Sequence, residues 1–489
     1  MTTWAEPAAA DRRHSSRRVW LLTMALVYPL CVLWSIAQPM FSGMDEAAHI
    51  ATAQGFSRFD FSEPFETDGL PMNEQDCFNP SEFITADCAN LVWGIDGTEV
   101  KTKTSDYPPG FHAVASIPAF VMSGLGGTYV MRLWMGLVCC SLLAWAAVLM
   151  LRPGRSRWLL LGLLMGLTPM SMSVMSTVNP SGMTVGFTAV AVAGLVARLR
   201  WEDRRLSVWV AIGVGLLGLV LVRRDGIAWV AVILTMFVPV VRADPEWRRR
   251  AWERWREVIG PRAAATLTVL VSLFAVGVFS GLIWVLPILR RFLTKSEVGG
   301  NRSRWQGIGE IQLNLQQMVG TLGRIHGFVG YELYSMVMVG GGIMVALALA
   351  GGKREWSRGT ALGVLALLVT PVAFGFVRFP YFQGRYLLSI WMALMMVAAV
   401  AMTTTDSGER LRIRLGGALL AIWWLVHLFS FWQALRRYSV GRWGGWWQVV
   451  SDPAWEPPMV GNGVVFALLV VTVAVPTPLV ARQLLRTTH

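Results

Sequence analysis

Long apolar runs, broken by short polar or basic stretches, follow one another along almost the whole chain. Most of them approach the roughly 20 residues that a helix needs to cross the hydrocarbon core of a bilayer. The runs are continuous rather than alternating, and an open sheet edge cannot be satisfied in lipid, so transmembrane strands are excluded. The pattern therefore predicts an all-α, polytopic helical bundle embedded in a membrane.

We predict about twelve transmembrane helices from this pattern. They lie near residues 19–38, 128–151, 158–177, 181–199, 206–222, 227–241, 263–287, 327–350, 360–377, 386–402, 415–431 and 464–480. The chain then divides into a tail at 1–18, a long loop at 39–127, a helical module at 128–287, a loop at 288–326, a second module at 327–481 containing a loop at 432–463, and a tail at 482–489.

Four arginines in the first eighteen residues predict that the N-terminal tail stays in the cytoplasm, which sends the first span outward. The loop 39–127 is then extracytoplasmic. Near its end, the run 108–125 is short, begins with Pro-Pro and ends among glycines, so we expect it to lie in the membrane interface rather than to span. This choice puts both chain ends and most basic residues on the cytoplasmic side. The basic stretch 244–259 is expected to be an amphipathic helix on anionic lipid.

Composition supports a membrane protein, with 54% hydrophobic and only 15% charged residues. The net charge of +13 arises from basic residues between spans rather than on one folded surface, so membrane lipids are expected partners and nucleic acid is not. Of five cysteines, Cys77 and Cys88 share the long outer loop, where disulfides persist. We predict a bond between them, with two free thiols as the alternative.

Two adjacent acids and a histidine, Asp45, Glu46 and His49, directly follow the first span, which is an unusual position for charge. If a helix begins at Asp45, the side chains of Asp45 and His49 lie one turn apart on one face and Glu46 points elsewhere. Our hypothesis is that Asp45 is a catalytic base at the water boundary, with Glu46 and His49 as further catalytic candidates. The alternatives are that Asp45 only caps a helix, or that Asp45 and His49 bind a divalent metal.

Transfer of a group from a lipid phosphate also needs cations that stabilise the departing phosphate. The candidates on the outer side are Arg223, Arg224, Arg378 and Arg385. Arg385 is favoured because it stands between Gly384 and Tyr386 where a span begins. The alternative for each arginine is that its side chain only reaches the lipid headgroups.

Other polar residues have supporting roles in this hypothesis. Arg132 lies inside a predicted span, so we expect it to face the bundle and to pair with an acid of the long outer loop, for structure or for function. Asn179, at an outer turn, either bonds substrate hydroxyls or caps the next helix. The remaining supporting candidates are Tyr107, His112, His326, Tyr381, Gln383 and Tyr386.

The order of these parts resembles the GT-C class of glycosyltransferases, which use polyprenyl-phosphate sugars and include the protein O-mannosyltransferases and the lipid A aminoarabinose transferase. The segments that carry the resemblance are Asp45-Glu46, Pro108-Pro109 and Arg132. Four segments are also similar to the bacterial multispanning family called domain of unknown function 2142, and these are Met44-Asp45-Glu46-Ala47-Ala48-His49, Tyr107-Pro108-Pro109, Asn179-Pro180 and Gln383-Gly384-Arg385-Tyr386.

The resemblance implies a GT-C-like fold in a bacterial cytoplasmic membrane and an inverting sugar transfer at the extracytoplasmic face. It implies Asp45 as the base, a donor phosphate held by outer arginines including Arg385, and a cell-envelope glycan or glycolipid as acceptor. An arabinosyl or mannosyl donor for cell-wall biosynthesis fits this group. Two departures are Ser181 where the family pattern has an acid, and Leu387-Leu388-Ser389 where it has a proline.

Two other functions remain open from the sequence. A transporter or flippase for lipid-linked sugars would use the same basic outer groove, but the chain shows no convincing internal symmetry of the kind that transporters have. A non-catalytic scaffold for envelope assembly explains the bundle but not Asp45-Glu46 at the membrane face.

Overall fold

The structure is a computed structural model that describes residues 9–61, 65–67, 81, 83–87, 98–100, 102, 104, 107–151, 158–243, 306–321, 330–376, 382–403, 409–458 and 460–475. Several features predicted from the sequence lie outside these residues. They are Cys77 and Cys88, the basic helix at 244–259, the span at 263–287, His326, Arg378 and Tyr381.

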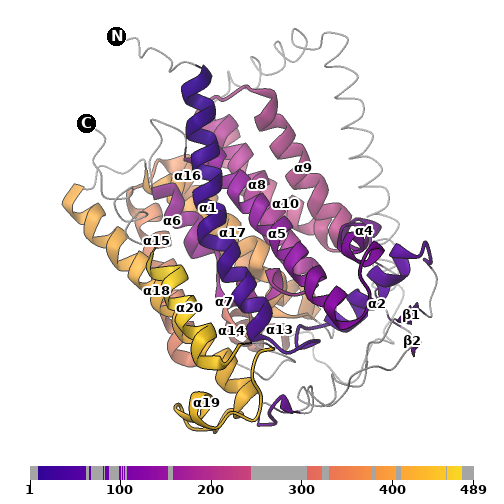
Figure 1. Cartoon of the computed structure of the whole chain (residues 1–489). Helices are drawn as coiled ribbons and strands as arrows, with labels where there is room; N and C mark the ends of the chain where they lie inside the picture. The colour runs from indigo at the N-terminus through magenta and orange to yellow at the C-terminus, as the bar shows by residue number, and fades with distance from the viewer. Residues whose placement is uncertain are drawn as a thin grey trace.

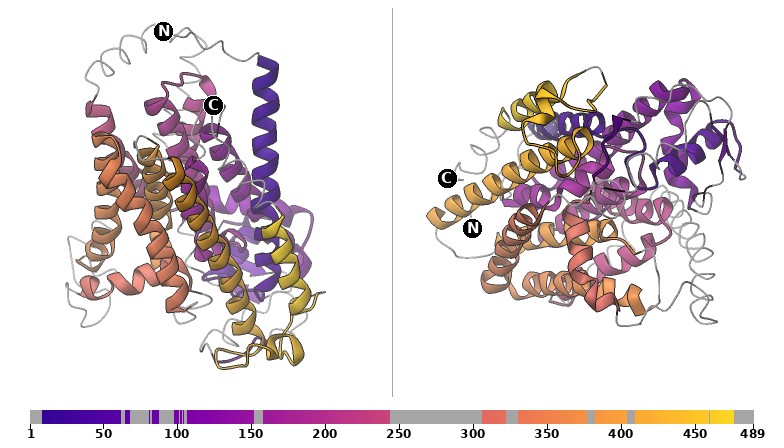
Figure 2. Two further views of the ribbon diagram at one scale, coloured as in Figure 1. Left: turned by 90° about the vertical axis from the view of Figure 1, so that its left-hand side faces the viewer. Right: turned by 90° about the horizontal axis from the view of Figure 1, so that it is seen from below.

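Long helices running side by side form the body of the molecule (Figure 1). The first group comprises α1 (Ala9–Ala37), α5 (Gly124–Met150), α8 (Pro180–Arg200), α9 (Leu206–Val222) and α10 (Gly226–Ala243). The second comprises α15 (Tyr331–Gly351), α16 (Arg354–Phe376), α17 (Leu388–Met402), α18 (Glu409–Ser439) and α20 (Asn462–Ala474). Figure 2 shows α1 and the α15–α16 pair on opposite sides of this bundle.

Eight of the described helices are long and apolar enough to cross a membrane, and α9 and α20 are shorter apolar helices. The predicted span at 158–177 is not one continuous helix. It is two helices, α6 (Trp158–Gly166) and α7 (Pro169–Met175), bent by 70° at their junction. The reason is local, because Thr168 and Ser171 form a capping box and Pro169 occupies the first turn, so the chain starts a new helix there. These elements account for every predicted span except 263–287.

Helix α17 is the centre of the bundle. Each of its residues is buried, and it packs against α6, α8, α15 and α16. Small residues allow the close approach of α6, since a Cβ at Gly166 would lie 2.5 Å from the sulfur of Met392. A helix that is apolar all round and covered on every side is held in one orientation, so its first turn is a rigid place for a functional side chain.

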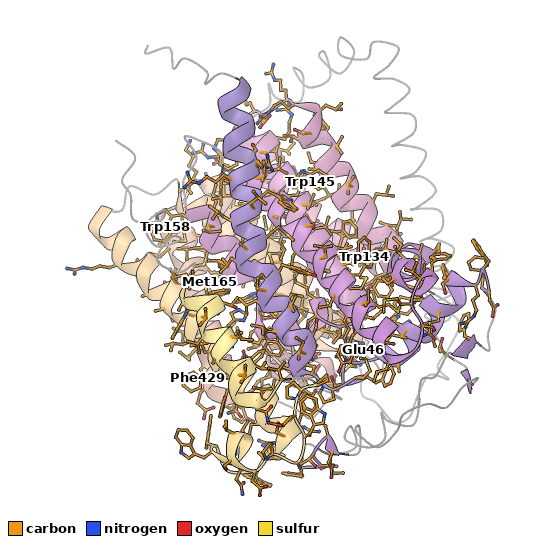
Figure 3. The ribbon with its side chains drawn as sticks, in the orientation of Figure 1. Glu46, Trp134, Trp145, Trp158, Met165 and Phe429 are labelled. Atoms are coloured by element: carbon orange, nitrogen blue, oxygen red, sulfur yellow. The ribbon has the colours of Figure 1, made fainter. Side chains whose placement is uncertain are left out.

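Short elements between α1 and α5 in the chain lie at one end of the bundle. They are α2 (Glu46–Ser57), β1 (Phe65–Thr67), β2 (Thr98–Val100), α4 (Pro109–Ala115) and the 3-10 turn η3 (Ile117–Phe120). The two strands pair antiparallel, with Phe65 opposite Val100. The seven residues of α4 span only about 10 Å and cannot cross a bilayer. The indole of Trp134 on α5 donates to the carbonyl of Val114 at 2.9 Å, which holds α4 against the bundle (Figure 3).

Four helix ends meet at the end of the bundle that lies away from the N-terminus (Figure 1). These are the C-terminal end of α1, the N-terminal ends of α8 and α17, and the C-terminal end of α9. The remaining short elements are α13 (Gln306–Gly309), α14 (Ile311–Val319), the 3-10 turn η4 (Gly384–Leu387) and α19 (Gln448–Ser451). Because η4 packs against α14 and leads directly into α17, it brings Arg385 to the same end as α2.

Candidate functional site

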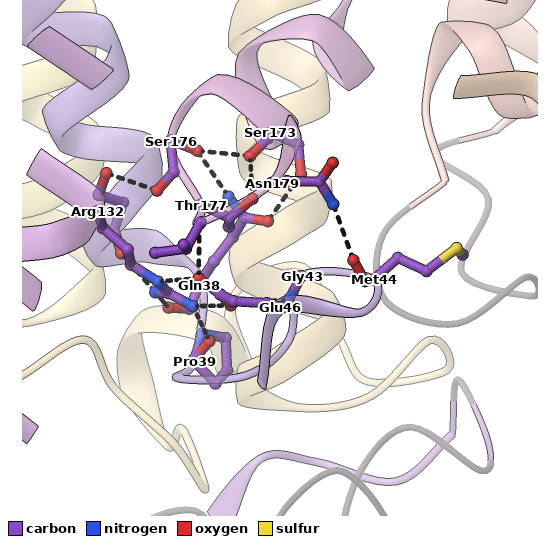
Figure 4. A network of polar contacts seen from close by, with 12 residues as sticks. Gln38, Pro39, Gly43, Met44, Glu46, Arg132, Ser173, Ser176, Thr177 and Asn179 are labelled. Atoms are coloured by element: carbon purple, nitrogen blue, oxygen red, sulfur yellow. Dashed lines mark hydrogen bonds and ion pairs between the residues drawn. The ribbon is translucent and has the colours of Figure 1, made fainter. Parts of the chain in front are cut away.

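A buried ion pair between Glu46 and Arg132 ties the first helices together (Figure 4). The Nε and Nη2 of Arg132 donate to the two carboxylate oxygens of Glu46 at 2.7 and 2.6 Å, and neither side chain is exposed. The sequence predicted that Arg132 pairs with an acid of the long loop, and this prediction is confirmed. The two-point geometry is the strong form of such a contact.

Arg132 uses all five of its N–H donors. Besides Glu46, it donates to the carbonyls of Ser35, Gln38 and Pro39 at 2.8 to 2.9 Å, which are the last carbonyls of α1 and its exit. Glu46 also accepts from the backbone N–H groups of Gly43 and Val178. The five N–H donors of Arg132 and both carboxylate oxygens of Glu46 are thus hydrogen-bonded inside the protein. Glu46, a catalytic candidate from the sequence, therefore takes a structural position instead.

A layer of neutral polar side chains continues this network toward α7 and α8 (Figure 4). The amide of Gln38 donates to Ser176 and accepts from Ser173. Of the two roles that the sequence left open for Asn179, the structure shows the cap, since its Oδ1 accepts the Ser181 N–H at the start of α8. Its Nδ2 donates to the carbonyl of Met44 at 2.8 Å. The backbone just before Asp45 is therefore fixed from the α8 side.

The condition under which Asp45 and His49 would share a helix face is not met. Helix α2 begins at Glu46, and Asp45 precedes it in the left-handed region with φ 60° and ψ 9°. The Asp45 carboxylate makes no cap hydrogen bond, and only its backbone carbonyl accepts the N–H of His49. A left-handed backbone is tolerated by Asp and Asn better than by most residues, and such positions are frequent at functional sites.

Instead of following the α2 face, the Asp45 carboxylate reaches across to Arg385. Its Oδ2 accepts a short hydrogen bond from Arg385 Nη2, and Arg385 Nη1 donates to the Met44 carbonyl at 3.0 Å. The guanidinium side chain is only 3% exposed, whereas the Asp45 side chain is 49% exposed. A half-exposed carboxylate therefore sits on a buried cation, and residues 340 positions apart in sequence make the contact.

Gly384 is what allows Arg385 to lie there. A Cβ at this position would stand 1.9 Å from the carbonyl oxygen of Asn314, so only glycine fits against α14. The Gly384 N–H donates to the side-chain oxygen of Gln317 on α14 at 2.8 Å. The Arg385 backbone is thus clamped between α14 and the buried first turn of α17.

Two further arginines join the cluster from the turn after α9. Arg223 is held by Asp225, with Nε to Oδ1 at 2.7 Å and Nη2 to Oδ2 at 3.1 Å, and its Nη1 donates to Ser181. Its guanidinium lies 4.3 Å from the centre of the Tyr386 ring, which Arg385 also approaches at 5.4 Å. Arg224 stands 5.3 Å from the ring centre of Tyr107. Aromatic faces support guanidinium groups in this way.

A buried histidine pair adjoins the arginines. His49 Nδ1 and His112 Nε2 are 3.2 Å apart, and the His49 ring packs edge-on against Tyr107 and Phe111. Burial lowers the pKa of His112 to about 3, and burial, with His112 and the arginines nearby, lowers that of His49 well below its usual range. Burial also raises the pKa of Tyr107 to about 12. These rings are neutral at pH 7.

The Asp45 and His49 side chains, weighed as a metal-binding pair, thus have different partners. Within the described part of the chain, no three histidine, cysteine or acidic side chains group together as metal ligands.

Comparison with known proteins places this chain in a family. The family model described as "Predicted membrane protein (DUF2142)" matches residues 29–394, which include every described site residue. The chain belongs to the DUF2142 family. This confirms the family resemblance inferred from the sequence motifs.

A solved structure, that of ArnT from Cupriavidus metallidurans in the apo state, is similar to this DUF2142 protein over 90% of this chain and 76% of that chain. The sequence identity is 14% and the TM-score is 0.38, and we draw nothing about this chain from a likeness at that level. No curated protein matches the sequence.

The site of this DUF2142 protein contains residues that sequence reasoning did not select. Asp225 and Ser181 fix Arg223, and Gln317 fixes the turn before Arg385. The signal for Asp225 was present, because it stands two residues after Arg223 and before a glycine. Ser181 and Gln317 carry no local signal. The supporting candidate Gln383 directly precedes η4. Its side-chain oxygen is buried and has no hydrogen-bond partner among the described residues.

The arrangement brings one reachable carboxylate, two arginines that both approach the Tyr386 ring, and neutral aromatic walls to one end of the bundle. The group consists of Asp45, Arg385, Arg223, Tyr386, Tyr107, His49 and His112, with Arg224 beside Tyr107. A carboxylate can take a proton from a hydroxyl, and guanidinium groups bind phosphate oxygens. The cluster in this DUF2142 protein is therefore suited to chemistry on a phosphate ester.

Proposed function

We propose that this DUF2142 protein is an inverting membrane glycosyltransferase that moves a sugar from a polyprenyl-phosphate donor to a cell-envelope glycan or glycolipid at the extracytoplasmic face. The observation that carries the proposal is the half-exposed Asp45 carboxylate on the buried Arg385. A structural ion pair does not require that the carboxylate bound to a buried arginine remain half-exposed, and neither does an arginine that only reaches the lipid headgroups. A site that deprotonates a hydroxyl beside a leaving phosphate does.

The proposed reaction balances with few groups. Asp45 takes the proton of the acceptor hydroxyl while the acceptor oxygen forms a bond to the anomeric carbon of the donor sugar. The bond from that carbon to the phosphate oxygen breaks, and the electron pair leaves with the polyprenyl phosphate. Attack opposite the leaving group inverts the anomeric configuration. Arg385 and Arg223 stabilise the charge that grows on the phosphate.

The membrane setting supports a lipid-linked donor. Arg385 precedes a fully buried helix, and Arg223 directly follows α9, so the cluster lies at the rim of the apolar bundle, where a phosphate on a membrane lipid is also found. Both arginines are already oriented, Arg223 by Asp225 and Arg385 by the Met44 carbonyl. Oriented guanidinium groups need little rearrangement when phosphate charge develops, which is the source of their catalytic effect.

The test is sugar transfer by purified protein in liposomes, from a radiolabelled polyprenyl-phosphate sugar to an envelope acceptor. Asp45→Asn is the variant of choice because Asn tolerates the left-handed backbone and retains the side-chain size. We expect transfer to fall by about 100-fold or more, the usual effect of losing a general base. Glu202→Gln is the matched control, because Glu202 is also a carboxylate at positive φ that pairs with an arginine, Arg204, away from the cluster.

The assay also separates this function from its alternatives. Transfer at the wild-type rate in folded Asp45→Asn would remove Asp45 from the mechanism. Movement of the intact lipid-linked sugar across the liposome membrane, without transfer to any acceptor, would identify a flippase instead.

A further inference from the structure

The three best-defined arginines differ in how completely they are bonded. Arg132 uses all five N–H donors, and Arg223 makes three hydrogen bonds to Asp225 and Ser181. Arg385 makes only two, to Asp45 and Met44, and its Nε is buried without a partner among the described residues. A buried N–H group without an acceptor costs free energy, about 1–3 kcal/mol in typical cases. Of the three arginines, Arg385 thus has the fewest hydrogen bonds to the described part of the protein, so it loses the least when one of them is exchanged for a bond to an anion.

Access to Arg385 runs past Asp45. The guanidinium side chain is 3% exposed and the carboxylate that covers it is 49% exposed. The Nε lies on the sealed side, so the Nη edge, which Asp45 occupies, is the edge that an incoming anion meets. The Asp45 carboxylate stands on this edge in the way of a second anion, and a second negative charge beside the carboxylate is unfavourable.

We infer that the carboxylate of Asp45 and an incoming phosphate compete for Arg385, so that phosphate binding releases the carboxylate. This rests on the proposed function. Without phosphate, Oδ2 of Asp45 is occupied by Arg385. When the phosphate takes the guanidinium, that oxygen becomes a free acceptor for the proton of the acceptor hydroxyl. The carboxylate therefore has both oxygens available once the donor is in place, and only one before.

The backbone around Asp45 is built to survive this exchange. The Met44 carbonyl accepts from two donors, Arg385 Nη1 and Asn179 Nδ2, and Asn179 is fixed by its cap on α8. If Arg385 turns toward phosphate, Asn179 still holds Met44. Asp45 also remains tied to α2 through its own carbonyl, which accepts from His49. Only the side chain needs to move, which is a change of rotamer rather than of fold.

The experiment measures binding of a short-chain polyprenyl monophosphate to the detergent-solubilised full chain by calorimetry, at fixed ionic strength. The variants are Asp45→Asn, Arg385→Gln and the double variant. Competition predicts that Asp45→Asn binds about tenfold more tightly than the wild type, which corresponds to about 1.4 kcal/mol. It predicts that Arg385→Gln binds at least about tenfold more weakly. The double variant should bind like Arg385→Gln.

The double variant is the decisive control, because removing any nearby negative charge favours anions in a general way. A general effect would still tighten binding when Arg385 is absent, whereas competition needs Arg385. Equal or weaker binding by Asp45→Asn, or a gain that persists in the double variant, overturns the inference while the loss in Arg385→Gln still supports the phosphate site. If Arg385→Gln binds as well as the wild type, both the inference and the proposed phosphate site fail. Inorganic phosphate, run in parallel, shows whether the lipid chain is needed.

Discussion

The Glu46–Arg132 pair offers the sharpest test of what holds this bundle together. Replacing Glu46 by Gln keeps the side-chain size but leaves the guanidinium of Arg132 buried and uncompensated. Removing one partner of a buried ion pair typically costs about 3–5 kcal/mol. Arg132→Met removes the cation and also leaves three carbonyls at the exit of α1 without their donor. We therefore expect Arg132→Met to be the more destabilising single change.

The double variant Glu46→Gln with Arg132→Met tests the reasoning behind these values. It removes both charges, so no buried charge is left alone, and replacing such pairs by neutral groups is often well tolerated. We expect it to be less destabilised than the sum of the two single changes, by a coupling of about 0.5–3 kcal/mol. Glu202→Gln, whose carboxylate is 62% exposed and pairs loosely with Arg204, should change stability by at most about 1 kcal/mol.

The measurement is the apparent Tm of detergent-solubilised protein, followed by the monomer peak that survives heating. A cost of about 3–5 kcal/mol corresponds to a fall of about 3–5 °C in a protein of this size. A Glu46→Gln variant that melts within 2 °C or so of the wild type would refute the view that the pair is isolated from water. Strict additivity in the double variant would show that the two residues do not depend on one another.

Two other predictions address the site. Gly384→Ala should abolish transfer and lower the apparent Tm, because its Cβ would collide with α14 and displace Arg385. The control is Gly342→Ala, where nothing lies within 4 Å of the added Cβ, and this change should be neutral or stabilising by about 1 kcal/mol. Equal effects of the two substitutions would contradict this account. The histidine pair predicts a pH dependence. Since burial lowers the pKa of both rings, the unfolded chain binds their protons first, so stability should be constant above about pH 7 and fall between about pH 6.5 and 4. His112→Gln should flatten that fall in Tm against pH, and an unchanged slope would show that His112 does not titrate this way.

Helices with strong apolar runs were predictable, because burial in lipid dictates both their length and their ends. Helix α9 has the predicted bounds at Leu206 and Val222. The break inside 158–177 was less visible, although Thr168 before Pro169 is a recognised start signal for a helix. There the apolar composition continued across the break and concealed it.

The site was predictable in its parts but not in its pairing. The sequence brought Asp45 and Arg385 forward separately, as an acid and a cation on the same side. Which of two adjacent acids meets Arg132 depends on where α2 begins, since a shift of one residue turns the side chain by about 100°. The left-handed backbone at Asp45 makes this choice, and the tertiary contacts of Met44 hold it there. Such contacts have no signature within a local stretch of sequence.

The division of labour between the two acids follows from this one turn. Because α2 starts after Asp45, Glu46 faces the bundle and both of its carboxylate oxygens bind Arg132. Asp45 faces the other way, and only its Oδ2 bonds Arg385, so that Oδ1 can accept another hydrogen bond. The buried Glu46–Arg132 pair fixes the position of the turn before α2. That turn places Asp45 against Arg385. A rigid structural contact next to a reachable carboxylate is what a site needs if its base must be held in place while its own arginine changes partner. The Asp-Glu order is therefore not interchangeable: exchanging the two side chains would bury the shorter acid away from Arg132 and place the longer one at a strained backbone position.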